Sequence, residues 1–369
     1  MKNTYVTKPS LPPLSEFHQM LSEIWESEYI TNSGPFHQKL EEELAKYLGV
    51  EYISVFSNGT LALITALQAL NIKGEVITTP YSFVATANSL MWNGITPVFA
   101  DINDQDCNIN LSAIEKAITP NTTALMPVHV YGVPCEVEAI EKLAKKYNLK
   151  VIYDAAHAFA IKKNGQSIHN YGDLSILSFH ATKVYNTIEG GAIISHSKEM
   201  KTKIDNLKNF GIIDELTVVD SGINAKMNEV QAAYGLLNLK YIDENIQKRK
   251  EVHAYYTTLL KEVKGLKILD IEHVENYNYG YFPVFLDSNY PISRDQLYDL
   301  LMANNIYSRR YFYPLITDFP IYSSIESAHR TNLPNAAKIT ESVLCLPMYA
   351  DLEKTTIDLI TNFVKNPVQ

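Results

Sequence analysis

The sequence has few cysteines and no long apolar run. Its three cysteines, none in a C-x-x-C pair, provide neither a disulfide framework nor a zinc site, and they are typical of a reducing compartment. No apolar run approaches the roughly 20 residues that a membrane-spanning helix requires. The first residues lack the apolar segment of a signal peptide. We therefore expect a cytoplasmic protein that does not insert into a membrane and holds no metal.

Positive charge is also scarce. Lys and Arg number 32 against 41 Asp and Glu, so the formal net charge is −9. This excess of negative charge argues against binding to nucleic acid. Two glycine motifs of nucleotide-binding proteins, G-x-x-x-x-G-K-[ST] and G-x-G-x-x-G, do not occur. Their absence argues against a P-loop and against a nicotinamide-binding Rossmann fingerprint.

The sequence does contain a regular alternation of strand and helix patterns. Hydrophobic residues make up 46% and charged residues 20%, which is usual for a globular protein. Short apolar runs typical of buried strands alternate with amphipathic helical segments, at residues 52–56, 75–79, 96–100, 124–129 and 150–154. This order predicts a doubly wound α/β domain.

A second, smaller domain is expected after a long helical stretch at residues 227–260. We place the large domain, with its proline-rich lead-in, at residues 1–245, and a small α+β domain at residues 246–369. The small domain would contain strands near residues 281–286 and 307–311, and helices near residues 294–303, 335–344 and 352–364.

Two chemical groups follow predicted strands of the large domain. The apolar run at residues 174–179 leads through a polar turn to Lys183, and the run at residues 151–153 leads to Asp154. Open parallel sheets bind ligands at the C-terminal ends of their strands. A lysine that forms a Schiff base and an aspartate that keeps a pyridine nitrogen protonated are the two groups that pyridoxal phosphate most needs.

Other features are ambiguous when each is taken alone. Residues 57–60 could cradle a phosphate or form an ordinary capped turn. An aromatic residue within 79–83 could stack on a flat ring or belong to the core. His157 could be a core histidine, and Asn224 could simply cap the long helix. Their order along the chain, with Asp154 and Lys183 between them, favours a cofactor site.

These residues give the chain a resemblance to the DegT/DnrJ/StrS family of sugar aminotransferases over essentially its whole length. The block at residues 178–192 is the most specific part. The resemblance implies the aspartate-aminotransferase fold (fold type I), with a mixed, mostly parallel sheet in the large domain. The similar segments are residues 58–63, 79–80, 83–86, 154–157, 178–183, 189–192 and 222–224.

The same resemblance implies pyridoxal 5′-phosphate as the cofactor and assigns residues to its ring. Lys183 would be the catalytic Schiff-base lysine, and Asp154 would be the partner of the pyridine nitrogen. Phe83 would stack on the ring. His157 stands near the ring hydroxyl, where many relatives carry Gln, so its hydrogen-bonding role is open.

The cofactor phosphate would be bound by residues from two subunits. The resemblance places Gly59, Thr60 and Ser178 at the phosphate, joined by Asn224 from the other subunit of a homodimer.

The substrate expectation rests on resemblance within the family. Residues 6–14, 179–191 and 309–314 are most similar to members that aminate carbon 4 of dTDP-4-keto-6-deoxy-D-glucose, with L-glutamate as donor, for O-antigen or lipopolysaccharide biosynthesis. Arg309, Arg310 and Tyr311 are the candidate sugar-nucleotide residues, although a solvated face explains the arginines equally well.

Three alternatives stay open at this point. The enzyme could aminate carbon 3 of a dTDP-3-keto-6-deoxyhexose, or use a UDP- or GDP-sugar. The chain could be a non-catalytic regulatory protein with the same fold, which the intact Lys183 and Asp154 disfavour. It could be a dehydratase, but dehydratases of the family carry His in place of the lysine.

Overall fold

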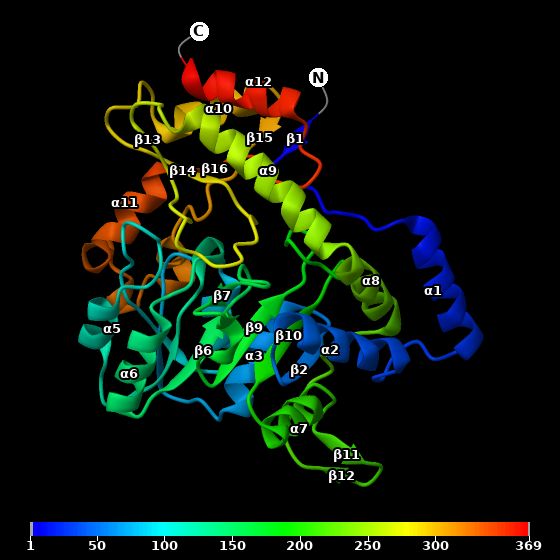
Figure 1. Cartoon of the computed structure of the whole chain (residues 1–369). Coiled ribbons are helices and arrows are strands. Elements are labelled where there is room, and N and C mark those ends of the chain that lie inside the picture. The colour runs from blue at the N-terminus through cyan, green and yellow to red at the C-terminus, as the bar shows by residue number, and fades with distance from the viewer. Residues whose placement is uncertain (1–2, 368–369) are drawn as a thin grey trace.

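A seven-stranded sheet forms the centre of the computed structural model, which describes residues 3–367 (Figure 1). Its strand order is β2-β10-β9-β6-β5-β3-β4, and β10 runs antiparallel to both of its neighbours while the other pairs are parallel. The strands are β2 (Tyr52–Phe56), β3 (Glu75–Thr78), β4 (Thr96–Phe99), β5 (Thr122–Met126), β6 (Lys150–Asp154), β9 (Leu174–Ser178) and β10 (Gly191–Ser195).

Helices cover both faces of this sheet. Along β6, Val151 and Tyr153 belong to one hydrophobic cluster, whereas Ile152 belongs to the cluster of the opposite face. Because both faces are buried, the strands are apolar throughout, and the prediction of a doubly wound, mostly parallel sheet is confirmed. The first cluster includes residues of α2 (Pro35–Leu48), α5 (Leu111–Ala117) and α6 (Val137–Tyr147), and the second includes residues of α3 (Gly59–Ala69), α4 (Ala85–Trp92) and α7 (Lys198–Leu207).

The C-terminal part of the chain has its own small sheet and core. Three antiparallel strands pack with three helices around residues such as Tyr256, Phe282 and Leu344. In Figure 1 this part lies at the top, and α9 runs diagonally into it from α8. The strands are β13 (Leu266–Ile268), β14 (Pro283–Leu286) and β16 (Val343–Cys345), and the helices are α9 (Ile242–Leu260), α10 (Arg294–Ala303) and α12 (Lys354–Lys365). The helix α8 (Glu229–Lys240) precedes α9.

Several element boundaries differ from the sequence predictions. The long helical stretch predicted at residues 227–260 is divided once, at Tyr241 between α8 and α9. The segment that follows β3 enters α4 at Ala85, where the hydroxyls of Ser82 and Thr86 lie 2.9 Å apart and Thr86 bonds to Asp154. The strand predicted at residues 307–311 is reduced to β15 (Ile306–Tyr307). The three-residue strands β13 and β16 were too short to predict.

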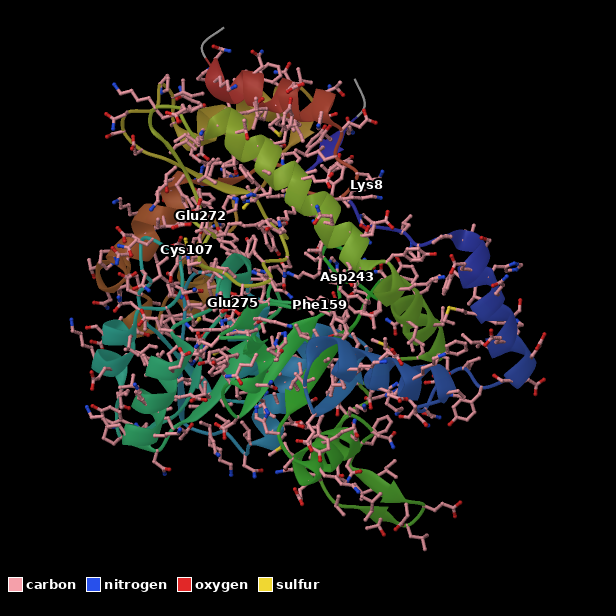
Figure 2. The ribbon with its side chains drawn as sticks, viewed as in Figure 1. Lys8, Cys107, Phe159, Asp243, Glu272 and Glu275 are labelled. Carbon is pink, nitrogen blue, oxygen red and sulfur yellow. The ribbon has the colours of Figure 1, made fainter. Side chains whose placement is uncertain are left out.

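Several segments connect the two parts of the chain. The N-terminal β1 (Thr4–Tyr5) pairs in parallel with β15. Glu275, labelled in Figure 2, lies on the loop between β13 and β14, and its carboxylate accepts the backbone N–H groups of Asn164 at 3.0 Å and Gly165 at 2.9 Å. The division into residues 1–245 and 246–369 stays a prediction, and its boundary falls in the first turn of α9.

None of the helices formed by the described residues has both the length and the apolar character that a membrane span requires.

Candidate active site

A cavity of about 320 Å³ opens at the C-terminal ends of the parallel strands. It contains most of the residues that the sequence singled out. The two parts of the chain both contribute to its wall, because residues 281, 311 and 312 come from the C-terminal part. The predicted site residues that line it are Gly59, Thr60, Phe83, Asp154, His157, Ser178, Lys183 and Tyr311.

Asp154 is the last residue of β6 and its side chain is buried. One carboxylate oxygen accepts the hydroxyl of Thr86 at 2.8 Å, and the other accepts the backbone N–H of Ala156 at 3.1 Å. Burial raises the pKa of this carboxyl, while those two hydrogen bonds and the charge of Lys183 lower it in part. Among residues 3–367, no Lys, Arg or His forms an ion pair with Asp154. A protonated ring nitrogen would supply the missing positive charge.

Lys183 lies in the turn between β9 and β10, where its backbone N–H bonds to the carbonyl of His180. Its Nζ donates a hydrogen bond to the hydroxyl of Tyr281 at 3.1 Å. Burial lowers the pKa of this amine to about 8, partly opposed by the charge of Asp154. An amine with such a pKa is nucleophilic and can exchange protons near neutral pH.

The start of α3 forms an anion cradle on the same cavity wall. Asn58 caps this helix through a bond from the N–H of Leu61 to its Oδ1 at 2.9 Å. A Cβ at Gly59 would lie 3.1 Å from the Cβ of Ser178, and a Cβ at Gly191 would lie 2.7 Å from the backbone of Gly59. Free N–H groups at a helix start, with the hydroxyls of residues 60 and 178 beside them, suit a phosphate.

His157 is buried and its hydrogen bonding is defined on one side. Its Nδ1 accepts the backbone N–H of Tyr131 at 3.2 Å, so the neutral ring carries its proton on Nε2. Burial and the charge of Lys183 keep its pKa well below the usual range. The ring packs parallel to Phe312 at 5.9 Å and tilted against Tyr281 at 4.6 Å. The Nε2–H of this histidine is therefore available as a hydrogen-bond donor, and its role toward the cofactor stays a prediction.

Phe83 provides an aromatic wall, since 63% of its side-chain surface is exposed although it lines the cavity. A large apolar ring left open to a cavity is suited to stacking on a flat ligand.

Three predicted residues lie outside this cavity. Asn224 is exposed, and its backbone pairs with Asn209. Arg309 is exposed as well. Arg310 bonds to Asp295 at 2.7 Å and lies over the ring of Tyr298. Their assigned roles remain predictions.

The structure adds residues that the sequence analysis did not select. Tyr281, Phe312 and Thr86 line the cavity, as do His180 and Glu189, whose side chains approach within 3.5 Å at its edge. A signal existed for three of them, because residues 86, 180 and 189 lie inside the resembling segments. Residue 312 lies inside the similar segment 309–314, although only its neighbours were selected as site residues. Nothing in the sequence indicated residue 281.

The fold and these groups define a pyridoxal-phosphate-dependent aminotransferase of fold type I: a buried carboxylate and an amine face one cavity beside an anion cradle. The comparisons with known proteins agree. Residues 14–365 match the DegT/DnrJ/EryC1/StrS aminotransferase family, and the chain belongs to this family.

The full-length relatives are similar in both sequence and structure. The chain is 52% identical over 364 residues to a dTDP-4-amino-4,6-dideoxy-D-glucose transaminase of Shigella dysenteriae, covering 99% of both chains. An enzyme of the same name from Escherichia coli is also 52% identical, with 98% of both chains covered. A solved structure of DesI in the presence of its TDP-sugar product superposes with a TM-score of 0.94 at 31% identity, covering 99% of this chain and 93% of that one. The predicted fold class is confirmed.

The close approach of Gly191 to the turn at residues 58–59 gives a test of the anion cradle. In Gly191→Ala the new methyl group would meet backbone atoms at 2.7 Å and push the start of α3 away. We expect the Kd for pyridoxal phosphate, measured by fluorescence titration, to rise by roughly tenfold, since overpacking costs about 1–3 kcal/mol. Ser195→Ala, at the far end of β10, serves as the control and should bind normally. If Gly191→Ala bound pyridoxal phosphate with wild-type affinity, Gly59 would not be part of the phosphate site.

Proposed function

We propose that this enzyme transfers the amino group of L-glutamate to carbon 4 of dTDP-4-keto-6-deoxy-D-glucose, giving dTDP-4-amino-4,6-dideoxy-D-glucose. The single observation that carries the proposal is the joint placement of Lys183 and Asp154 in one cavity of a chain that is 52% identical, end to end, to transaminases with that product name. Amination at carbon 3 is not favoured, because these relatives are named for carbon 4.

The cofactor is held by residues with separate tasks. When bound, pyridoxal phosphate supplies a carbonyl carbon that exchanges the amino group and a ring that delocalises the charge left by deprotonation. Asp154 would accept the ring N–H and keep that nitrogen protonated. His157 would donate its Nε2–H to the ring hydroxyl, and Phe83 would cover one ring face. The start of α3, with Thr60 and Ser178, would bind the phosphate.

Lys183 moves the proton in both halves of the reaction. Its free amine would remove the proton from the amino-acid carbon and deliver it to the carbon on the cofactor side. In the second half-reaction, with the keto sugar, the amine would move the proton in the opposite direction. The amine is suited to this exchange, since burial lowers its pKa to about 8, which is nearer to neutral pH than that of an ordinary lysine. Thr86 and Ala156 keep the Asp154 carboxylate in place meanwhile.

The sugar nucleotide is assigned to the cavity wall formed by the C-terminal part. Tyr311 lines the cavity beside Tyr281, with ring centroids 6.0 Å apart. Arg309 is exposed, which leaves its guanidinium available to a diphosphate. Arg310 would have to leave Asp295 to do the same.

We also propose a homodimer with shared active sites. Asn224 does not reach the cavity of its own chain, so a second copy would have to supply it. The hairpin of β11 (Ile212–Asp214) and β12 (Thr217–Val218) projects from the body of the protein at the lower edge of Figure 1. It leaves large apolar side chains exposed, namely Phe210, Ile213, Leu216, Val218 and Val219. Such an apolar projection is typical of a subunit contact.

The cellular setting is part of the same proposal. The three cysteines are free and buried, as expected in a reducing cytoplasm. A sugar carried on a nucleotide is an activated donor, and its consumption by a glycosyltransferase would place the enzyme in O-antigen or lipopolysaccharide biosynthesis.

A product assay tests the reaction directly. Protein, cofactor and L-glutamate are mixed with dTDP-4-keto-6-deoxy-D-glucose, and the sugar is analysed by mass spectrometry and NMR. We expect an amine at carbon 4 and 2-oxoglutarate in equal amounts. Lys183→Ala should lower turnover by about 10³-fold or more, because it removes the proton carrier. Lys338→Ala, an exposed lysine, is the matched control. An amine at carbon 3, or normal turnover in Lys183→Ala, would contradict the proposal.

Sedimentation tests the dimer. The wild-type protein should sediment with twice the chain mass of 41.7 kDa. Leu216→Glu puts a charge on the most exposed apolar residue of the hairpin, at 96% exposure, and should weaken the dimer and the affinity for cofactor. Met302→Glu, at an exposed position of α10, should change neither. A monomeric wild-type protein with full cofactor affinity would be incompatible with shared sites.

A further inference from the structure

Tyr281 contacts the lysine amine but has no role in the assignments above. The hydroxyl of Tyr281 receives the hydrogen bond from Lys183 Nζ at 3.1 Å. Within residues 3–367, neither group makes a hydrogen bond to any other protein atom through its side chain. Each is therefore the sole fixed partner of the other on the cavity wall.

The backbone around Tyr281 is held on both sides. On one side the carbonyl of Phe282 accepts the N–H of Leu346, which ties the segment to the small sheet. On the other side the buried Asn278 accepts the N–H of Gly280 at 3.1 Å. The amide of Asn278 also donates to the carbonyl of His157 at 2.9 Å. The backbone on either side of Tyr281 is thus tied both to the small sheet and to the loop that follows Asp154.

The ring of Tyr281 is confined as well. It packs against His157 at 4.6 Å and Tyr131 at 5.7 Å, and stands edge-on to Tyr311 at 6.0 Å. These contacts limit the ring to a narrow range of positions. The hydroxyl therefore marks one defined place for the amine of Lys183.

Lys183 needs such a place during turnover. In the proposed reaction its free amine would carry a proton between two carbon atoms. A lysine side chain that is free in a cavity has many rotamers, so an unrestrained amine would spend much of its time away from the reacting carbons. A fixed hydrogen-bond acceptor keeps the amine close to those carbons for more of the time.

The phenol itself does not carry the proton. Burial raises the pKa of Tyr281, as does Cys345 nearby, while the buried guanidinium of Arg249 acts in the opposite direction. The net effect is a phenol that stays protonated at neutral pH. It can accept a hydrogen bond from the ammonium form of Lys183 and donate one to the neutral amine, without changing its own charge.

We propose that Tyr281 is a positioning residue that holds the free amine of Lys183 beside the reacting carbons during both half-reactions. This inference rests on the proposed function, because it assigns a role within that reaction. The hydrogen bond between these two residues also links the two parts of the chain. Lys183 lies in the turn between β9 and β10, and Tyr281 lies in the segment leading into β14.

The variant Tyr281→Phe removes only the hydroxyl and leaves the ring packing in place. Tyr279→Phe is the matched control, because Tyr279 lies two residues earlier, does not line the cavity, and its hydroxyl bonds to no protein group among the described residues. Melting temperatures of both variants show whether the fold is retained.

Two readouts are measured on each variant. The first is the half-reaction with L-glutamate, for which we expect kcat to fall about tenfold or more while KM stays within a factor of about 3, as expected for loss of one charge-assisted hydrogen bond. The second uses the apoprotein: pH-dependent acetylation of Lys183, followed by mass spectrometry. Its midpoint, near pH 8 in the wild type, should move to lower pH, because the ammonium has lost its acceptor.

The two readouts separate the possible failures. If Tyr281→Phe matches Tyr279→Phe in either readout, the positioning role is overturned. If the wild-type protein aminates no keto sugar nucleotide, the proposed function fails, but the labelling of the apoprotein still decides whether the hydroxyl holds the amine.

Discussion

The burial of the Asp154 carboxylate is the constraint on which the site depends. Removing a carboxylate from water costs several kcal/mol, and the cost is offset only by hydrogen bonds and a positive partner. Thr86 and Ala156 provide the hydrogen bonds, while no cation of the described protein forms an ion pair with it. The cavity beside Asp154 therefore suits a cationic ligand, and a protonated pyridine ring is such a ligand.

The other elements of the site follow from that position. The start of α3 is held near Ser178 by glycines at positions 59 and 191, where a side chain would collide with backbone or with the serine. The start of α3 and the carboxylate therefore line one cavity. Lys183 lines the same cavity from the turn between β9 and β10, so groups at the ends of neighbouring strands would together hold the cofactor.

Much of this arrangement is local and could be predicted from the sequence. Buried parallel strands leave uninterrupted apolar runs. Asp154 ends one of these runs, and Lys183 follows another after a short polar turn. Contacts between distant segments could not be predicted. Tyr281 is 98 positions from Lys183, and its approach depends on how the small sheet packs against the large one. Likewise, the proton position on His157 is set by the backbone of Tyr131, and the pairing of Arg310 with Asp295 is a tertiary contact.

The most direct test of the central claim is a single-turnover measurement on Asp154→Asn with L-glutamate. An amide has the same shape as the carboxylate but cannot stabilise a protonated ring nitrogen. We predict that the variant binds pyridoxal phosphate within a few-fold of the wild type, while the rate of amino transfer to the cofactor falls by about 10²-fold or more. Transfer at the wild-type rate in the cofactor-saturated variant would contradict the account, because the charge of Asp154 would then have no part in the chemistry.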